Sequence, residues 1–246
     1  MNRLVKWVVL LAAAGTYPGL AAADWSGKGE LGAALASGNT DTENVNAKLE
    51  LTNELGSWTH GFGLAGIYAS DSGATTGQRW EVFGQSDYNF SERDFWFGAA
   101  RYEDDRFSGF DYQATVSTGL GRHFVDTERM KLTGTAGIGY KYFETRDVLD
   151  DLGNLIERGD SDSNLIFRGT VDFEYQLTAT TKVLDKFLVE AGSDNTYLQN
   201  DLALQVKMTD VLALSVGYQV RHNTDPPAGF KKSDTLTTVN LVYEFK

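Results

Sequence analysis

The 246-residue chain lacks cysteine altogether and has only three histidines and three prolines. Without cysteine there is no disulfide, no thiolate zinc site, no iron–sulfur cluster and no cysteine nucleophile. Basic residues are also scarce, since 22 Lys and Arg stand against 34 Asp and Glu for a net charge of −12. A nucleic-acid partner is therefore not expected, because such partners need a basic surface. Three histidines cannot form a His-rich metal site, and we expect no metal and no cofactor.

Long apolar runs are missing too, except at the N-terminus. Arg3 and Lys6 precede the apolar run 7–14, and the small residues 21–23 match a cleavage site. This arrangement predicts a secretory signal peptide over residues 1–23, cleaved after Ala23. The alternative, a retained membrane anchor, needs about 20 apolar residues, more than this run supplies. The second region, 24–246, is then the mature chain.

What the mature chain has is alternation of apolar and polar residues. A clear example is the apolar series Leu212, Leu214, Val216, Tyr218 and Val220, whose intervening residues include Ser215, Gln219 and Arg221. Period two with β-branched and aromatic residues is the signature of strands. About twelve such segments follow one another without a helical period or a linker. We predict an all-β fold: a single transmembrane, antiparallel, up-and-down β-barrel of about twelve strands over 24–246.

A soluble β-sandwich also alternates, and three features favour the membrane barrel over it. The segments are long for a soluble sheet, whose strands have about 5–6 residues. The polar face carries charges of both signs, while the apolar face carries almost none. Aromatic residues gather at segment ends, where the interfaces of a membrane would lie: Trp25, Trp58, Tyr68, Trp80, Tyr88, Tyr112, Tyr142, Tyr175, Tyr218 and Tyr243.

The connections alternate in length, and this predicts an orientation. Those expected to face outward are 37–43, 69–77, 105–110, 145–163, 192–195 and 223–233. Those expected in the periplasm are 56–57, 89–93, 125–129, 178–180 and 208–210. The second set is uniformly short, as periplasmic turns are in such barrels.

Several stretches of the mature chain together form a recognisable pattern: Ser37–Thr42, Tyr88–Ser91, Arg101–Phe107, Gly119–Arg122, Asn223–Pro227, Lys232–Thr235 and the ending Leu241–Lys246. These stretches resemble the YdiY-type salt-induced outer membrane protein family. The resemblance spans essentially the whole mature chain. It implies a link to salt or envelope stress, and no catalytic residues come with it. The C-terminal signal departs from the usual ending because Lys246 follows Phe245, and we expect the assembly machinery to read Tyr243 and Phe245.

Two kinds of chemical site are considered and not favoured. A lipase or protease would use His60, His123 or His222 beside a serine or acid, but the sequence shows no serine at a cross-strand position. The spacing Asp160-x-Asp162-x-Asn164 opens a calcium loop, within an acidic stretch 144–162. Leu165 stands where the turn glycine belongs, so a solvated loop is the favoured interpretation, and weak divalent-cation binding stays an alternative.

The inward charges are the most informative candidates. By alternation they share one lumen: Lys48, Glu50, Arg79, Glu81, Arg101, Glu103, Lys141, Arg168, Asp172, Glu174, Lys186, Glu190, Lys207 and Arg221. They either line a small aqueous pore or pair across the lumen and restrict it, because an unpaired buried charge is costly. We expect Arg168 to pair with acids such as Asp172 or Glu174.

The predicted role is therefore a structural barrel or narrow pore in envelope or salt-stress homeostasis, in the outer membrane of a Gram-negative bacterium. A general small-solute porin and an outer-membrane enzyme are the alternatives, and we expect no enzyme. The expected partners are the bilayer, lipopolysaccharide and the assembly machinery, with no protein partner identified.

Overall fold

A computed structural model describes residues 24–37, 42–71, 74–106, 108–149, 155–227 and 229–246. The predicted signal peptide, 1–23, lies outside these ranges. The described residues form fourteen strands: β1 (Asp24–Ser37), β2 (Thr42–Leu55), β3 (Trp58–Asp71), β4 (Ala74–Asn89), β5 (Asp94–Asp105), β6 (Phe110–Asp126), β7 (Met130–Thr145), β8 (Val148–Leu149), β9 (Leu155–Glu157), β10 (Ser161–Gln176), β11 (Thr181–Ala191), β12 (Thr196–Lys207), β13 (Leu212–Asn223) and β14 (Ser233–Phe245).

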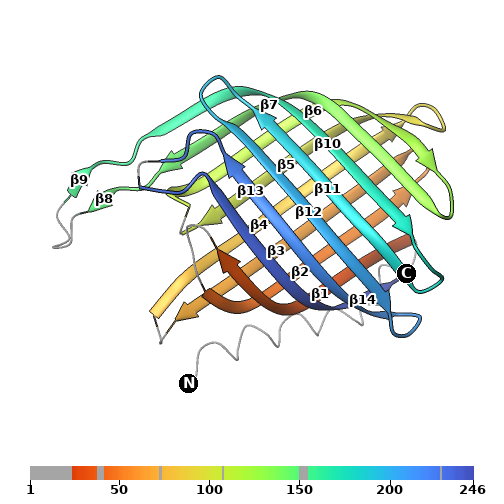
Figure 1. Cartoon of the computed structure of the whole chain (residues 1–246). Helices are drawn as coiled ribbons and strands as arrows, with labels where there is room; N and C mark the ends of the chain where they lie inside the picture. The colour runs from red at the N-terminus through yellow and green to blue at the C-terminus, as the bar shows by residue number, and fades with distance from the viewer. Residues whose placement is uncertain (1–23, 38–41, 72–73, 107, 150–154, 228) are drawn as a thin grey trace.

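Twelve of these strands form one closed antiparallel barrel (Figure 1). Neighbours in the chain are neighbours in the ring, and β14 closes it by pairing with β1, from Gly27 opposite Phe245 to Ser37 opposite Thr235. Closure leaves no strand edge unpaired, which a sheet in lipid requires. The prediction of a single up-and-down barrel of about twelve strands is confirmed.

The two faces of the wall follow the alternation in the sequence. Outward side chains are apolar and exposed, for example Leu31 at 52%, Val116 at 57% and Ile138 at 67%. Inward neighbours such as Lys141 and Gln205 are buried and polar. Exposed apolar groups over a whole wall suit a lipid environment rather than water. Within the described ranges, no helix is long and apolar enough to cross a membrane.

The strand ends differ slightly from the expected connections. β4 begins at Ala74 and β10 at Ser161, inside segments predicted as loops. The long connection 145–163 also holds a small hairpin of β8 and β9, which extends beyond the barrel in Figure 1. This end also carries the long connection 224–232, and we call it the long-loop end and the opposite end the short-turn end. The predicted contrast in length holds for these two connections alone, because two to four residues separate β1 from β2, β3 from β4, β5 from β6 and β11 from β12, as they do the strands joined at the short-turn end.

The barrel is not round, and glycines mark two places where its wall bends sharply. A Cβ atom on Gly119 would lie 2.2 Å from the carbonyl oxygen of Ala136, and one on Gly137 would lie 2.2 Å from that of Thr118. On the opposite side, a Cβ on Gly32 would lie 2.2 Å from the carbonyl oxygen of Val239. Such close backbone approach is possible only for glycine.

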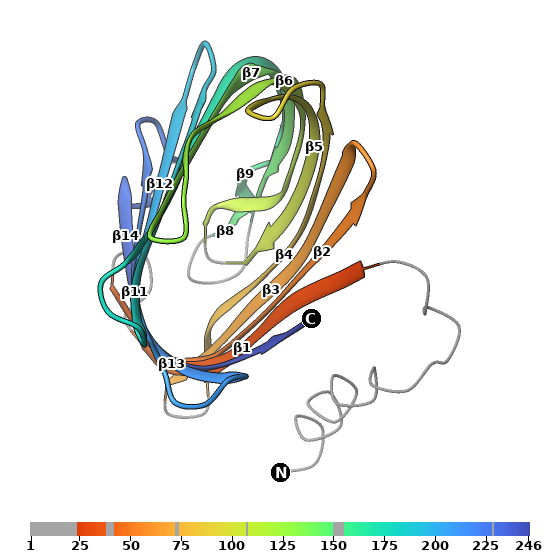
Figure 2. The ribbon, with the colours of Figure 1, turned by 90° about the vertical axis from the view of Figure 1, so that its right-hand side faces the viewer.

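These two bends, at β6–β7 and at β1–β14, are diametrically opposed in the ring. The barrel is consequently drawn out between them, as Figure 2 shows from the short-turn end. Strands β2–β5 form one long wall and β10–β13 form the other. The short diameter of the lumen therefore lies between these two walls.

Candidate functional site: side chains that cross the lumen

The lumen is crossed near the long-loop end by an ion pair between opposite walls. Arg221 on β13 and Glu103 on β5 are six strands apart in the ring of twelve. The Nη2 atom of Arg221 donates to both carboxylate oxygens of Glu103, at 2.8 Å for Oε2. Glu103 is buried at 1% exposure, and the side chain of Arg221 is 11% exposed. We call this contact the Arg221–Glu103 bridge.

The bridge belongs to a larger charged cluster. Arg101 also pairs with Glu103 and contacts Oε2 of Glu81 at 3.1 Å. Arg221 further contacts Asp105 at 3.4 Å. Charges of opposite sign thus alternate along the cluster, so each buried charge has a partner, as desolvation demands.

Tyr197 on β12 lies among these charges, at 3% exposure. The guanidinium groups of Arg101 and Arg221 and the ammonium group of Lys141 approach its ring, at 5.7, 5.4 and 5.2 Å from the centroid. The Nε atom of Arg221 donates to the Tyr197 hydroxyl at 2.6 Å. Cations over an aromatic face are stabilised by its quadrupole, so Tyr197 fixes the arginine and lysine heads within the lumen.

A second contact between the long walls lies closer to the short-turn end. Lys186 on β11 reaches Oε1 of Glu50 on β2 at 3.5 Å, and we call this the Lys186–Glu50 bridge. Glu50 also pairs with Lys28 at 3.4 Å and with Lys48 at 3.0 Å. The side chains of Lys186 and Asp172 are 54% and 46% exposed, so this part of the lumen is more open than the part around Glu103.

The expected pairing of Arg168 with Asp172 or Glu174 is wrong. Asp172 pairs with Lys186 at 3.9 Å, and Glu174 pairs with Lys182 at 3.8 Å. Arg168 instead lies 5.7 Å from the ring of Phe97. Its Nη1 atom is buried without a hydrogen-bond partner among the described residues. The reason is register: Asp172 lies directly opposite Lys186, which binds it. Glu190, directly opposite Arg168, is bound by Lys141 at 3.4 Å.

The remaining predicted lumen charges also face inward. Arg79 donates to Gln219 across the lumen at 3.3 Å. Lys207 is exposed at the last residue of β12, at the short-turn end. The structure thus brings most of the predicted residues into the two bridges and their surroundings.

Sequence reasoning missed several members of the site. Tyr197 was not a candidate, although its place one residue before outward Leu198 gives it inward parity. Phe95 and Phe97, at 2% and 0% exposure, fill the lumen beside the charges. Their signal was present in the run Phe95-Trp96-Phe97, where only Trp96 faces outward, at 46% exposure.

Two histidines do lie within reach of serines. Nδ1 of His60 is 2.9 Å from Oγ of Ser86, and Nδ1 of His222 is 2.7 Å from Oγ of Ser233. The sequence alone did not show these two cross-strand serines. Within the part of the chain that the structure describes, no acid is hydrogen-bonded to either ring, so the orienting third group of a catalytic triad is missing.

His123 contacts the Thr133 hydroxyl at 2.9 Å. The Asp160–Asn164 stretch largely belongs to β10, where Asp162 pairs with Phe143 in register. Extended backbone does not wrap a calcium ion as a loop does. Among the residues described, no group of three or more His, Asp or Glu is placed to hold a metal ion.

Comparison with known proteins assigns this barrel to a family. A family model described as "Protein of unknown function, DUF481" matches residues 29–245. The chain belongs to the DUF481 family. The uncharacterized protein YdiY of Escherichia coli (strain K12) is 24% identical to it over 229 residues, 92% of this chain and 85% of YdiY. The predicted YdiY-type resemblance is thereby confirmed for this DUF481 barrel.

Solved structures agree with the fold of the DUF481 chain. The NanC porin superposes with a TM-score of 0.55 at 12% identity, over 88% of this chain and 100% of NanC. The translocator domain of the autotransporter NalP from Neisseria meningitidis gives 0.56 at 13% identity, over 90% of this chain and 88% of that domain. These likenesses establish a shared barrel architecture.

Proposed function

We propose that this DUF481 protein is an outer-membrane barrel of a Gram-negative bacterium whose lumen is a narrow, ion-pair-restricted pore. The observation that carries the proposal is the Arg221–Glu103 bridge, which joins diametrically opposite strands. Only ions and very small solutes pass beside such a contact. The porin and translocator folds that resemble this barrel support the outer-membrane location.

The same proposal places the long-loop end outside the cell and the short turns in the periplasm, following the usual loop asymmetry. Lipid and lipopolysaccharide surround the apolar wall. The assembly machinery reads the last strand, where Tyr243 is 49% exposed and its ring lies 6.0 Å from that of Phe245. The role is in envelope homeostasis under salt stress.

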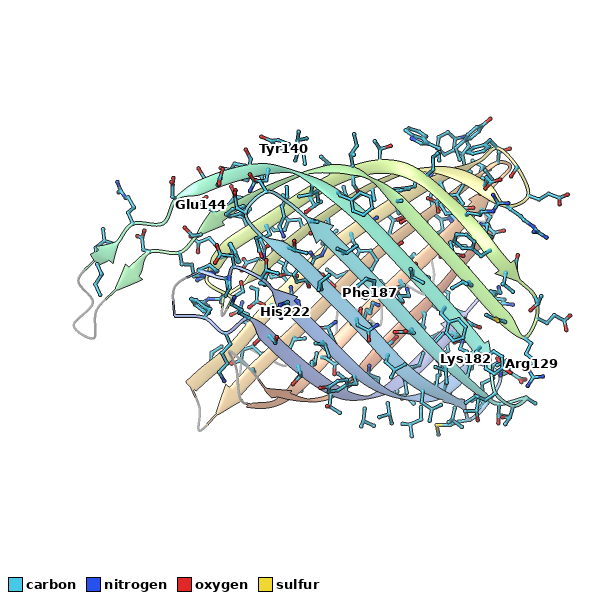
Figure 3. The ribbon with its side chains drawn as sticks, turned by 45° about the horizontal axis from the view of Figure 1, so that its top comes forward. Arg129, Tyr140, Glu144, Lys182, Phe187 and His222 are labelled. Atoms are coloured by element: carbon cyan, nitrogen blue, oxygen red, sulfur yellow. The ribbon has the colours of Figure 1, made fainter. Side chains whose placement is uncertain are left out.

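Conductance in planar bilayers tests the pore. The wild type should give small steps. Arg221→Ala removes the side chain that crosses the lumen and leaves Glu103 and Asp105, so conductance should rise and shift toward cations. Arg129→Ala is the control, because Arg129 lies in a turn at the short-turn end (Figure 3) over the ring of Tyr175. Arg129→Ala removes one positive charge, as Arg221→Ala does, but at a position outside the lumen.

A large, weakly selective conductance in the wild type would refute restriction and favour a general porin. Silence in both the wild type and Arg221→Ala would refute the pore and favour a structural barrel. In either case the fold and the family membership stand.

The proposal includes no catalytic role. The two His–Ser pairs are hydrogen bonds near the ends of their strands. Phospholipid and ester substrates offered to the protein in liposomes should not be hydrolysed faster than with heat-denatured protein. A hydrolysis rate that falls in Ser233→Ala or Ser86→Ala would overturn this part of the proposal.

A further inference from the structure

An acidic side chain lies on the lipid-facing side of the wall. On β11, Lys182, Lys186 and Glu190 make the ion pairs inside the lumen, so the odd-numbered residues face outward. Phe187 confirms this parity at 38% exposure. Asp185 shares it and lies in register with outward Leu202. Asp185 therefore faces lipid.

Asp185 is also deep within the membrane-spanning part of its strand. It is the fifth of the eleven residues of β11. With a rise of about 3.3 Å per residue and a tilt of about 40°, four residues place it about 10 Å above the first residue of the strand. In Figure 3, Lys182 marks the short-turn end and Phe187 lies midway along the barrel. Asp185 lies between these two residues along β11.

Other outward acids show the contrast. Asp94 is the first residue of β5, Asp104 is one residue from its end, and Glu144 is one residue from the end of β7. Those positions lie at the membrane interfaces, where a charged side chain costs little free energy. A charge within the hydrocarbon costs several kcal/mol and by default indicates a functional position.

Within the described part of this chain, a single side chain offsets the cost of placing Asp185 in the hydrocarbon. Nδ2 of Asn200, on the neighbouring strand β12, donates to Oδ1 of Asp185 at 2.7 Å. Among the described residues Asn200 is the one hydrogen-bond partner of the Asp185 side chain. The second carboxylate oxygen accepts no hydrogen bond from the described residues. We call Asp185 and Asn200 the wall pair.

The wall pair lies at the centre of a long wall. The bends at β6–β7 and β1–β14 bound the wall β10–β13, and β11 and β12 are its two middle strands. The surrounding outward residues are apolar, including Phe187, Leu202 and Leu204. The centre of a long wall is the place where another surface of the same kind makes the most extensive contact.

We propose that the wall pair is the centre of an interface with a second copy of this chain. In a two-fold interface, residue i of one copy meets residue j of the other, and j meets i. Asp185 supplies an unused carboxylate oxygen, and Asn200 supplies a second N–H, which within its own chain has only a 3.5 Å contact to the Lys186 carbonyl. Two facing wall pairs complement each other, each Asn200 donating to Asp185 of the partner copy.

Donor and acceptor balance favours a second copy over other occupants. Lipid chains offer no donor to the free oxygen. A cationic partner would satisfy Asp185 but leave Asn200 without a function in the interface. The two-fold arrangement uses both residues and adds two intermolecular hydrogen bonds.

Cysteine cross-linking tests the interface. Because the chain has no native cysteine, an introduced thiol is the only one that can react. Leu202→Cys places a thiol beside Asp185, and Leu64→Cys places one on β3 in the opposite wall. The two leucines are similarly exposed, at 46% and 43%. In liposomes, a short thiol cross-linker should join two copies of the Leu202→Cys protein and leave the Leu64→Cys protein monomeric. Equal cross-linking, or none, at both positions would overturn the proposal.

Sedimentation equilibrium in density-matched detergent measures the role of the wall pair. Asn200→Ala removes both intermolecular hydrogen bonds and should weaken the dimer about tenfold, given the modest strength of such bonds in membranes. Asp201→Asn, the next residue but inside the lumen, should leave the dimer unchanged. Folding of each variant is checked by its heat-modifiable mobility in gels. A folded wild type that stays monomeric, or a dimer insensitive to Asn200→Ala, would overturn the proposal.

Discussion

At the scale of single residues, Glu103 is the most consequential side chain of the lumen, because one carboxylate is shared by two guanidinium groups. Arg101 and Arg221 both pair with it, and it is 1% exposed. Removing its charge leaves two buried cations with Glu81 and Asp105 as their remaining carboxylate partners. The negative charge of Glu103 therefore mainly offsets the cost of burying the two guanidinium groups. Forming a buried ion pair gains little free energy, but removing one partner leaves an unpaired buried charge and costs much more.

Glu103→Gln should accordingly lower the free energy of unfolding by about 3–5 kcal/mol. Urea titration of the protein folded into liposomes, followed by tryptophan fluorescence, measures the change. Glu92→Gln, in the exposed turn before β5, is the matched control and should change stability by less than about 0.5 kcal/mol. Equal effects of the two substitutions would show that the bridge contributes nothing.

Arg168→Ala should behave quite differently. The substitution loses the contact with Phe97, worth up to about 2 kcal/mol, but it also removes a buried donor that has no partner among the described residues. These effects oppose each other, so we expect a net change within about 1 kcal/mol. A loss as large as that predicted for Glu103→Gln, in the same urea titration, would mean that Arg168 holds an acid after all.

The inward direction of these charges is predictable from alternation, but their partners are not. Arg221 and Glu103 are 118 residues apart in sequence and meet only because the barrel is flattened. Asp172 and Glu174 lie close to Arg168 in sequence, yet lysines on β11 bind them. Contacts across a lumen depend on the shape of the whole cross-section. This shape cannot be predicted from a local sequence pattern.

At the scale of elements, the strands with long alternation were predicted almost completely, because each has one face in lipid and one in the lumen. The hairpin of β8 and β9 was not, since strands of two and three residues are too short to show alternation. The two faces also differ in what they tolerate, and this difference gives a test of face assignment.

Leu204→Arg and Leu184→Arg form such a test. The two leucines lie on adjacent strands at nearly the same level, because Leu204 pairs with Val183 and Leu184 pairs with Ala203. Leu204 faces lipid at 43% exposure, so an arginine there should cost about 2–4 kcal/mol. Leu184 faces the lumen directly opposite Glu174, so an arginine there should cost less than half as much. Refolding yields and urea midpoints in liposomes compare them, and a reversed order would show that the faces are misassigned.

The glycine bends give a second test at this scale. Gly137→Ala would place a methyl group 2.2 Å from the Thr118 carbonyl oxygen and should destabilise the barrel by about 1–3 kcal/mol through overpacking. Gly98→Ala meets nothing within 4 Å and should be nearly neutral. Thermal unfolding in detergent compares the two. If both alanines are tolerated equally, the bend does not depend on the missing side chain.

At the scale of the whole molecule, the asymmetry of loops and turns predicts how the barrel sits in the cell. A protease added to intact cells should cut within 145–163 and spare 178–180, because only the long-loop end faces the medium. Immunoblotting of an affinity tag after Lys246 follows the fragments. Cleavage at 145–163 that requires permeabilised cells would reverse the orientation.

The flattened ring has a consequence for how such a pore opens. Twelve hydrogen-bonded strands give the ring a fixed perimeter, and for a fixed perimeter a circle encloses the largest area. The two bridges join the long walls. Releasing them lets the ring become rounder and its enclosed area grow, without breaking a single hydrogen bond between strands. For the proposed pore, this makes the eccentricity of the ring, rather than the number of strands, the quantity that sets permeability.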